Sequence, residues 1–403
     1  MGHITLFTLP EPGHLFPTFR IADTLRRRGH NIRYVSFPQF ETDIRSLGFA
    51  FSGILGKYIE NICDSESLLE TRHSGSQIYQ SLFPQLQREG PAVIADIIRT
   101  ISSCPVDLLI IDSGLRMLDG AFSGYSKGTA PVSNALQCLA CSFLRISATF
   151  TEVYEVFPIS DFFRSLPELV LCPKVFDLPT APPSRHECHF VEPSVFTKRA
   201  PVAFPWNWID PSRKLVYCSL GTQSQNYHGA IPLLRHMVKA FGSFQRFQMV
   251  MTVGGHCDPA VFGHLPDNVF LCKSAPQLQL LERTSVAITH GGLGTIKEAI
   301  LSGVPMLVVP FNVDQPFNAR RVTHHGVGTA VLPRSIPEHH HIGQILEHLA
   351  FDKGLSERVR HLQHVFQRIE EASPSIMHIE NLLNSQHDTK VSAAPFRADE
   401  TTN

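Results

Sequence analysis

The chain has 403 residues, of which 43% are hydrophobic and 18% are charged, and its formal net charge at pH 7 is −1. This length allows two domains of ordinary size, and the composition is typical of a globular protein rather than a disordered one. The balanced charge, with no dense stripe of lysine and arginine, argues against nucleic acid or another polyanion as a partner.

Three local clusters have ordinary structural explanations. Cys138 and Cys141 form a CxxC pair inside an apolar segment, and the nine cysteines include no second such pair, which favours small buried side chains over a zinc or redox site. The arginines at 26–28 end a predicted helix before Gly29, where they complement the helix dipole. The histidines at 339–341 are expected in a solvated loop. We therefore expect no metal site.

No targeting or membrane segment is expected. Residues 3–9 already have the pattern of a first strand, which leaves no room for an N-terminal signal peptide. No apolar run reaches the roughly 18 residues that a membrane span needs. The sequence therefore predicts a soluble, cytoplasmic protein without a transmembrane segment.

The first half begins as a βαβ unit. Residues 3–9 predict a strand, and residues 10–16 predict a turn. Pro17 then takes a favoured first helical position, and the helix is expected to stop at Gly29, a residue suited to the C-cap. Residues 32–37 form the second expected strand.

The rest of this half is predicted from apolar patterns. Segments 76–88 and 91–102 are helix-like, and the continuous apolar run 106–111 is typical of a strand buried on both faces. We expect a further strand at 131–135 and helical structure from 136 to 165.

Residues 167–211 are dense in proline and cannot build regular structure throughout. We interpret 201–213 as a linker between an N-terminal domain at 1–200 and a C-terminal domain at 214–384. Residues 385–403 are polar with little apolar pattern and are expected to form a disordered tail.

The second half repeats the alternation of strands and helices. The expected strands are 214–220, 246–253, 269–272 and 286–289, and the expected helices are 229–241, 277–283, 342–351 and 353–371. Two such halves with a Pro-rich join predict an α/β protein of two Rossmann-like domains that face each other across a cleft, where ligand sites preferentially lie.

The most informative segment is 289–315, THGGLGTIKEAILSGVPMLVVPFNVDQ. Its glycines allow close backbone approach, and the helix that follows offers unpaired N–H groups to a phosphate. Glu298 is expected in the first turn of that helix, where its carboxylate can bind sugar hydroxyls. Asp314 and Gln315 follow strand 304–310, at the edge where open α/β sheets bind ligands. Together these features predict a nucleotide-sugar site.

Residues 275–315 resemble the signature box of the nucleotide-sugar glycosyltransferases with the GT-B fold, a family that includes plant natural-product enzymes, animal glucuronosyltransferases and bacterial antibiotic and carotenoid enzymes. The spacing holds without gaps, because Glu298 follows His290 by eight residues and Asp314 follows Glu298 by sixteen. Two positions differ from the plant pattern. Ser274 replaces the aromatic residue that stacks on the base, and Leu293-Gly294 replaces a Trp-Asn pair, as in many bacterial members.

The resemblance implies a set of residues that bind the nucleotide sugar: Ser219, Thr222, Gln277, His290, Gly292, Gly294, Thr295, Glu298, Asp314, Gln315 and Asn318. Ser219 and Thr222 belong to the SxGT/S motif that opens this domain in the family, and Gln277 is expected at the base. Asp314 and Gln315 face the 3- and 4-hydroxyls of a hexose in family members, which implies a fully hydroxylated sugar, glucose first, on uridine diphosphate.

His14 and Asp112 are the expected catalytic residues. His14 follows the first strand, and a neutral imidazole is the natural base for a hydroxyl near pH 7. Asp112 ends the apolar run and is the candidate to orient the imidazole, with Asp107 and Asp119 as alternatives. In the family, the histidine of a GHxxP-type motif is the base, and an aspartate about a hundred residues later orients it.

The mechanism implied is direct displacement with inversion at the anomeric carbon, the leaving diphosphate being met by helix amides and His290. There is no Asp-x-Asp pair of the kind that holds a divalent metal, so we expect metal independence and no cofactor beyond the nucleotide sugar as co-substrate. Segments 57–90 and 113–165 are expected to bind the acceptor. Their apolar residues and interleaved aromatics (Phe122, Tyr125, Phe143, Phe150 and Tyr154) agree with a lipophilic small molecule.

The sequence allows three alternative functions. A dinucleotide-dependent oxidoreductase is disfavoured, because LPEPGHLFP after the first strand lacks the GxGxxG spacing. A nucleotide-sugar epimerase of the same architecture would release an epimerised nucleotide sugar without an acceptor. A non-catalytic relative that binds a partner enzyme is disfavoured by the presence of His14, Glu298, Asp314 and Gln315.

Overall fold

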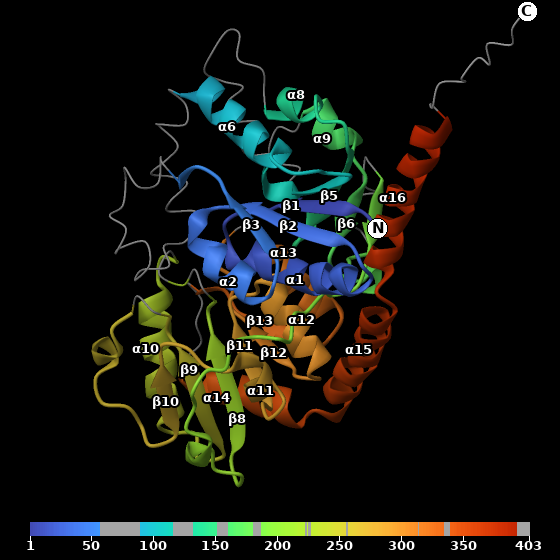
Figure 1. Cartoon of the computed structure of the whole chain (residues 1–403). Helices are drawn as coiled ribbons and strands as arrows, with labels where there is room; N and C mark the ends of the chain where they lie inside the picture. The colour runs from blue at the N-terminus through green and yellow to red at the C-terminus, as the bar shows by residue number, and fades with distance from the viewer. Residues whose placement is uncertain are drawn as a thin grey trace, which may run out of the picture.

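The structure is a computed structural model of the chain that describes residues 1–56, 89–115, 132–150, 160–179, 187–221, 224, 227–254, 257–312, 314–333 and 339–392. Over these residues the strands form two separate parallel sheets, one in each half of the chain. Figure 1 shows the two halves stacked one above the other, each with its sheet between helices. The α/β architecture of two Rossmann-like domains is therefore confirmed.

The first sheet has the strand order β3-β2-β1-β4-β5-β6-β7. Its strands are β1 (His3–Phe7), β2 (Asn31–Ser36), β3 (Ala50–Gly53), β4 (Leu108–Asp112), β5 (Ser142–Ser147), β6 (Glu168–Val170) and β7 (Cys188–Phe190). The helices of this half are α1 (Pro12–Arg27), α2 (Glu41–Ser46), α6 (Gly90–Ser102), α8 (Val132–Leu136) and α9 (Asp161–Ser165).

The central strands of this sheet are buried on both faces, as the apolar run 106–111 predicts. Leu108 and Ile110 belong to the core beneath α1, whereas Leu109 and Ile111 belong to the core beneath α6. Successive side chains of a strand point to opposite faces, so a strand covered on both sides needs apolar residues at every position.

Three expectations for this half are wrong. Helix α1 starts at Pro12, so Pro17 lies inside the helix rather than at its first position. Glu11 accepts the backbone N–H groups of His14 and Leu15 and thereby starts the helix early. Pro12 at the first helical position suits this start, because it needs no hydrogen-bond partner for its nitrogen.

The other two errors concern strand β5 and the segment before it. Residues 132–136 form helix α8 rather than a strand, and residues 142–147 form strand β5 inside the segment expected to be helical. Arg145 in the middle of β5 is fully buried and pairs with Glu168 of β6 at 2.9 Å. A charged residue interrupts the apolar pattern by which a buried strand is predicted. The acidic partner of Arg145 lies too far along the chain for the ion pair to be predicted from the local sequence.

The second sheet has the strand order β10-β9-β8-β11-β12-β13. Its strands are β8 (Lys214–Ser219), β9 (Phe247–Thr252), β10 (Val269–Cys272), β11 (Val286–Thr289), β12 (Met306–Val308) and β13 (Gly328–Ala330). The helices are α10 (Ala230–Phe241), α11 (Gln277–Leu281), α12 (Leu293–Leu301), α13 (Gln315–His324), α14 (His339–Phe351) and α15 (Lys353–Ala372). These elements agree with the expected alternation.

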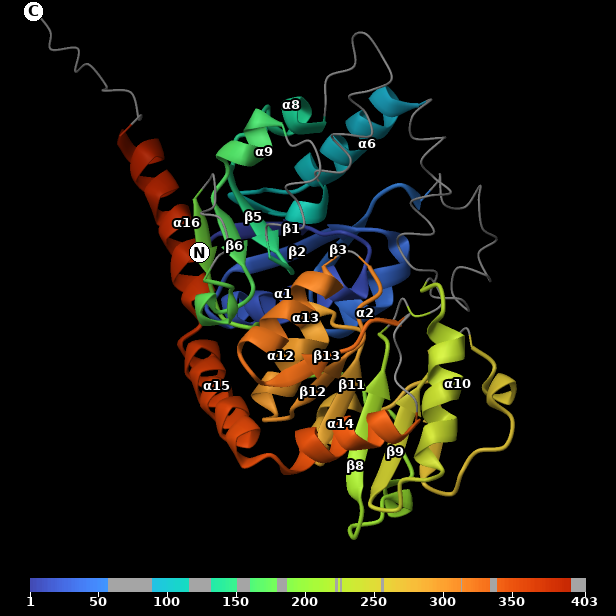
Figure 2. The ribbon, with the colours of Figure 1, turned by 180° about the vertical axis from the view of Figure 1, so that it is seen from behind.

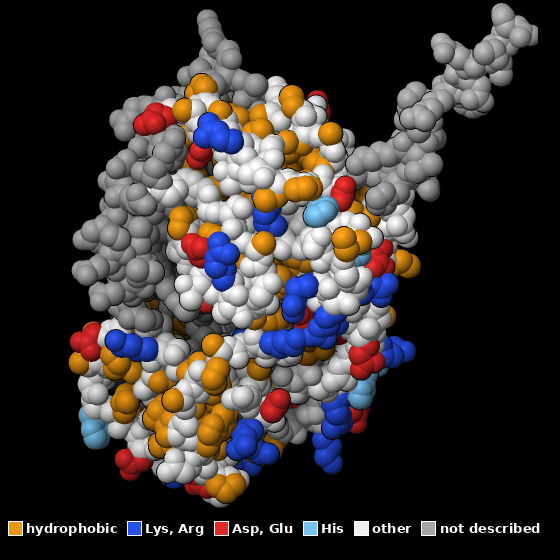
Figure 3. All heavy atoms as spheres, viewed as in Figure 1, with side chains coloured by type: hydrophobic (Ala, Val, Ile, Leu, Met, Phe, Trp, Pro, Cys, Tyr) orange, Lys and Arg blue, Asp and Glu red, His pale blue; other side chains and the backbone are white. Residues whose placement is uncertain are grey.

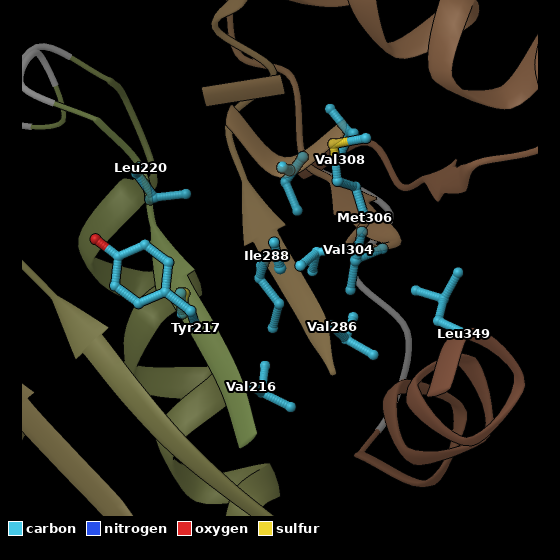
Figure 4. Close-up of a cluster of buried hydrophobic side chains, with 14 of the residues drawn as sticks. Val216, Tyr217, Leu220, Val286, Ile288, Val304, Met306, Val308 and Leu349 are labelled. Carbon is cyan, nitrogen blue, oxygen red and sulfur yellow. The ribbon is translucent and has the colours of Figure 1, made fainter. Parts of the chain in front are cut away.

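The core of the second domain forms between β8, β11, β12 and the helices that cover them. Figure 4 shows Val216 of β8, Ile288 of β11, Met306 of β12 and Leu349 of α14 as members of one cluster. Phe150 from the first half belongs to the same apolar cluster. The two domains therefore share part of one core, which holds them against each other.

The last helix, α16 (Pro374–Ser392), returns to the first domain. Figure 2 shows α15 beside the second domain and α16 running on along the first. Ile376, Ile379 and Leu383 belong to the core beneath α1, although they lie in the range 214–384 that the sequence assigns to the second domain. The helix also continues to Ser392, inside the expected tail, and residues 393–403 lie outside the described part of the chain.

The expected linker covers the outer edge of the second sheet. Phe204 and Trp208 each contact Phe270 of β10, with ring centres 5.4 Å apart in both pairs. Figure 3 shows hydrophobic side chains gathered over this part of the surface. None of the helices in the described ranges is long and apolar enough to cross a membrane.

Candidate active site

Each sheet reverses its strand order at one point, and both points lie where a ligand is expected. In the first sheet β1 has β2 on one side and β4 on the other, and in the second sheet β8 lies between β9 and β11. Crevices that bind ligands open at the carboxyl ends of strands where the order reverses. His14 and Asp112 lie at the first of these points, and Ser219 and His290 lie at the second.

His14 and Asp112 are in direct contact. Nδ1 of His14 lies 3.1 Å from Oδ1 and 3.0 Å from Oδ2 of Asp112, and Oδ1 also accepts the backbone N–H of Gly114 at 2.7 Å. A Cβ at Gly114 would lie 2.0 Å from the Leu9 side chain, so this turn requires glycine. Because Nδ1 binds the carboxylate, Nε2 of His14 is the nitrogen left for a substrate.

Asp107 and Asp119 are the two alternatives to Asp112 as the partner of His14. Asp107 lies before β4, at the opposite edge of the sheet, where its Oδ2 accepts the backbone N–H of His3 at 2.9 Å. It therefore cannot reach His14. Asp119 lies outside the described residues.

The charge state of His14 is set by its carboxylate neighbours. Burial alone would lower the pKa of His14, but the charge and hydrogen bond of Asp112, with the charges of Glu11 and Asp314, outweigh burial and raise this pKa to about 9. The side chain of His14 is a quarter exposed, whereas that of Asp112 is buried. With this raised pKa, His14 must lose a proton before it can act as a base.

His290 opens the glycine-rich loop and is held between two glycines. A Cβ at Gly221 or at Gly292 would lie within 2.5 Å of the imidazole ring, so neither position can carry a side chain. Burial lowers the pKa of His290 to about 4, against a hydrogen bond with the backbone of Ser219 that acts in the opposite direction. His290 is therefore neutral and would offer a diphosphate an N–H group rather than a positive charge.

The helix that is expected to bind phosphate forms where the sequence predicts it, with one correction. Gly292 is the N-cap of α12, and Gly294 and Thr295 lie in its first turn. Glu298 is the sixth residue of α12 and therefore lies in its second turn, not its first. Thr222, expected beside this helix, lies outside the described residues.

Glu298 forms hydrogen bonds with both of its carboxylate oxygens. Oε2 accepts the side-chain N–H of Gln277 at 2.5 Å, and Oε1 accepts a guanidinium N–H of Arg199, from the end of the first domain. The amide oxygen of Gln277 in turn accepts the hydroxyl of Tyr217 at 3.0 Å. The structure thus connects two residues that the sequence assigns to the ribose and the base.

Asp314 lies directly between the two domains. Its Oδ2 accepts the Thr149 hydroxyl from the first domain at 3.2 Å and the side-chain amide of Asn318 at 2.8 Å. Burial raises the pKa of Asp314, while these two hydrogen bonds and the charge of His14 oppose the rise. Asn318 is fully buried, so it positions Asp314 and Gly291, whose carbonyl it also binds at 2.9 Å.

Sequence reasoning missed three residues of this region, namely Arg199, Thr149 and Tyr227. Tyr227 accepts a hydrogen bond from Gln315 at 3.0 Å. Arg199 lies at the edge of a proline-rich segment, and Thr149 follows a strand that was expected to be helical. Residues of this kind are identified only by contacts between distant segments, because nothing in their local sequence marks them.

The expected acceptor region falls mostly outside the described residues, including Phe122, Tyr125 and Tyr154. Phe150 is 1% exposed and packs against Phe176, so it is a core residue. Phe143 packs edge-on against Phe162. Within the described ranges, no group of three or more histidine, cysteine or acidic side chains is arranged to hold a metal ion.

Comparison with known proteins agrees with this arrangement. Residues 242–365 match the family described as the C-terminal domain of erythromycin biosynthesis protein CIII-like proteins. The NDP-glycosyltransferase YjiC of Bacillus subtilis (strain 168) is 23% identical over 377 residues, which cover 90% of this chain and 92% of YjiC. The oleandomycin glycosyltransferase of Streptomyces antibioticus is 26% identical over 347 residues, which cover 82% of this chain and 78% of that enzyme.

Solved structures share the whole fold. The calicheamicin glycosyltransferase CalG4 superposes with a TM-score of 0.67 at 22% identity, covering 96% of this chain and 99% of CalG4. The spinosyn rhamnosyltransferase SpnG superposes with a TM-score of 0.66 at 20% identity, covering 91% of this chain and 96% of SpnG. The resemblance that the signature box indicates is confirmed, and the chain is a glycosyltransferase with the GT-B fold that uses a nucleotide sugar.

Proposed function

We propose that this glycosyltransferase moves a hexose, glucose first, from uridine diphosphate to a hydroxyl of a lipophilic small molecule, with inversion at the anomeric carbon. The observation that carries the proposal is the position of His14, which is bonded to Asp112 and whose charge also acts on Asp314 of the other domain. The candidate base of one domain thus lies near the carboxylate that is expected to bind the hexose in the other.

The reaction is a direct displacement. Nε2 of His14 takes the proton of the acceptor hydroxyl, and the oxygen attacks the anomeric carbon from the face opposite the diphosphate. The bond from that carbon to the diphosphate oxygen breaks, and the nucleoside diphosphate leaves with the electron pair. Asp112 holds the imidazole and stabilises the imidazolium that forms.

The donor would lie across the carboxyl edge of the second sheet. Its diphosphate would bind the amides at the start of α12, where Gly292, Gly294 and Thr295 lie, together with neutral His290 and the turn after Ser219. Glu298 would bind the ribose and Gln277 the base. Asp314, positioned by Asn318, would bind hydroxyls of the hexose.

The lipophilic acceptor is supported by the relatives. Several act on natural products, as the names of the oleandomycin and calicheamicin enzymes state, and SpnG has been solved with spinosyn aglycone. SpnG has also been solved with thymidine diphosphate, so the nucleotide must be tested directly.

The experiment is a donor screen. Purified protein is mixed with glucose, galactose and rhamnose donors on uridine and thymidine diphosphate, together with a panel of phenols and macrolide alcohols, and products are identified by mass spectrometry. We expect transfer from UDP-glucose above all. An epimerised donor formed without acceptor would identify an epimerase instead, and lack of donor binding in calorimetry would identify a non-catalytic relative.

A further inference from the structure

Every hydrogen-bonding position of the Gln315 side-chain amide has a partner within the protein. Its Oε1 accepts the backbone N–H groups of Phe311 at 2.8 Å and Asn312 at 3.1 Å. Its Nε2 donates to Oδ1 of Asn312 at 3.2 Å and to the hydroxyl of Tyr227 at 3.0 Å. A carboxamide has two acceptor lone pairs and two N–H groups, so all four are engaged.

The orientation of this amide follows from its partners. Backbone N–H groups can only donate, so the atom that faces Phe311 and Asn312 must be the oxygen, and the nitrogen must face Tyr227. Gln315 is also only 4% exposed. A sugar hydroxyl would have to break one of these hydrogen bonds in order to bind Gln315 itself.

Tyr227, in contrast, is arranged to donate. Its oxygen accepts the Gln315 N–H, which directs the phenolic proton away from Gln315. The ring is fixed by Phe311, at 4.9 Å between ring centres and 13° between ring planes, and by His290 at 5.8 Å and 28°. Burial, with the charges of Asp314 and Glu11, raises the pKa of Tyr227 to about 12, so the hydroxyl keeps its proton.

The contacts of Tyr227 place it beside residues that are expected to bind the donor. His290 begins the loop expected at the diphosphate, and Asp314 is the carboxylate expected at the hexose. Glu11, whose charge also acts on Tyr227, lies three residues before His14 in the first domain. The transferred sugar has to lie among these groups, between its diphosphate and the base.

We propose that the Tyr227 hydroxyl, oriented by Gln315, donates a hydrogen bond to a hydroxyl of the transferred hexose. Gln315 is then the residue that fixes Tyr227 and the turn at Phe311–Asn312. This inference rests on the proposed hexose transfer, and it adds Tyr227 to the sugar contacts that the signature box implies.

The test uses Tyr227→Phe, which removes the hydroxyl and keeps the ring stack. We expect kcat/KM for UDP-glucose to fall about tenfold, the usual effect of leaving one buried partner unpaired, while the Kd of UDP changes less than about twofold. Each donor of a monodeoxyglucose series lacks one hydroxyl. The donor that lacks the hydroxyl bound by Tyr227 should be used equally well by the wild type and the variant. Tyr34→Phe is the matched control, because it removes another buried hydroxyl, bonded to Thr18 in the first-domain core.

A double-mutant cycle with Gln315→Ala tests the positioning role. If Gln315 acts through Tyr227, the Tyr227→Phe/Gln315→Ala enzyme is no worse than the poorer single variant. A further tenfold loss in the double variant would mean that Gln315 touches the sugar itself. Parallel loss of UDP affinity in Tyr227→Phe would assign the hydroxyl to the diphosphate.

The outcomes separate this inference from the proposed function. If the wild type transfers glucose and Tyr227→Phe equals it on every donor, the role of Tyr227 is refuted and the transferase reaction stands. If the wild type transfers no hexose from any donor, the proposed function fails first.

Discussion

Arg199, at the end of the first domain, donates a hydrogen bond to Glu298, the carboxylate that the signature box assigns to the ribose. Its Nε also donates to the carbonyl of Phe196 at 3.1 Å, so the guanidinium is held from both ends. Glu298 is 7% exposed and also binds Gln277. A nucleotide that uses Glu298 must therefore share or displace the Arg199 contact.

Replacing Arg199 with glutamine is expected to tighten UDP binding by up to about fivefold, because a partly exposed ion pair of this kind contributes about 0.2–1 kcal/mol. Calorimetry with UDP measures the effect. Lys198→Gln is the control, since Lys198 pairs with Asp23 of α1, and it should leave the Kd unchanged. Weaker UDP binding by the Arg199 variant would show that the guanidinium binds the nucleotide instead.

The contact between Arg199 and Glu298 illustrates what the sequence could not predict. Most of the strands and the His14–Asp112 pair follow from local apolar patterns and from the rule that parallel strands end at one edge. Glu298, with its spacing of eight residues from His290, could also be identified from the sequence. Its partner lies 99 residues away and in another domain, where no local pattern indicates a pairing.

The same limit explains the errors in secondary structure. Strand β5 was missed because Arg145 interrupts its apolar pattern, and the compensating Glu168 comes 23 residues later. Gln315 was correctly placed after its strand, but the use of all four of its hydrogen-bonding positions depends on Tyr227, 88 residues away.

The pH dependence of transfer should reflect the raised pKa of His14. The pKa of about 9 means that the basic form of the free enzyme increases as pH rises through 9, so kcat/KM should rise along that limb. The contribution of His14 to the free energy of unfolding changes with pH in the opposite direction. The folded pKa exceeds the ordinary 6.5, so the stabilising effect of the pair is complete below pH 6.5 and is lost as pH rises through 9.

Asp112→Asn should move that limb to lower pH, because the carboxylate that raises the pKa of His14 is gone while burial remains. The maximal rate should nevertheless fall on the order of 10²-fold, since asparagine holds the imidazole poorly. Asp107→Asn, at the other edge of the sheet, is the control and should behave as wild type. A normal pH profile in the Asp112 variant would show that another group orients His14.

His290 should contribute to acid destabilisation. Its folded pKa of about 4 lies below the ordinary 6.5, so the unfolded chain takes up a proton first and stability falls as pH drops from 6.5 to 4. Replacing His290 with glutamine should remove on the order of 1–3 kcal/mol of this pH dependence. Urea unfolding of both proteins at pH 7 and pH 4.5 measures it. An identical pH dependence in the variant would show that His290 is not held neutral.

Transfer should proceed at near full rate in excess chelator. The proposed site meets the diphosphate charge with the amides at the start of α12 and with neutral His290. Initial rates with EDTA, magnesium and manganese test this. Stimulation by either metal of more than about tenfold, equal to ~1.4 kcal/mol of barrier, would contradict it.

The most direct test of the proposed mechanism is a comparison of wild type and His14→Ala in one preparation. Rates of glucose transfer from UDP-glucose and the Kd of UDP are measured for both proteins. We predict that the variant loses ~10²–10⁴-fold in transfer rate while UDP affinity stays within about twofold, because the base acts on the acceptor and the donor is held by the other domain. Transfer by His14→Ala at the wild-type rate would contradict the account and remove His14 from the mechanism.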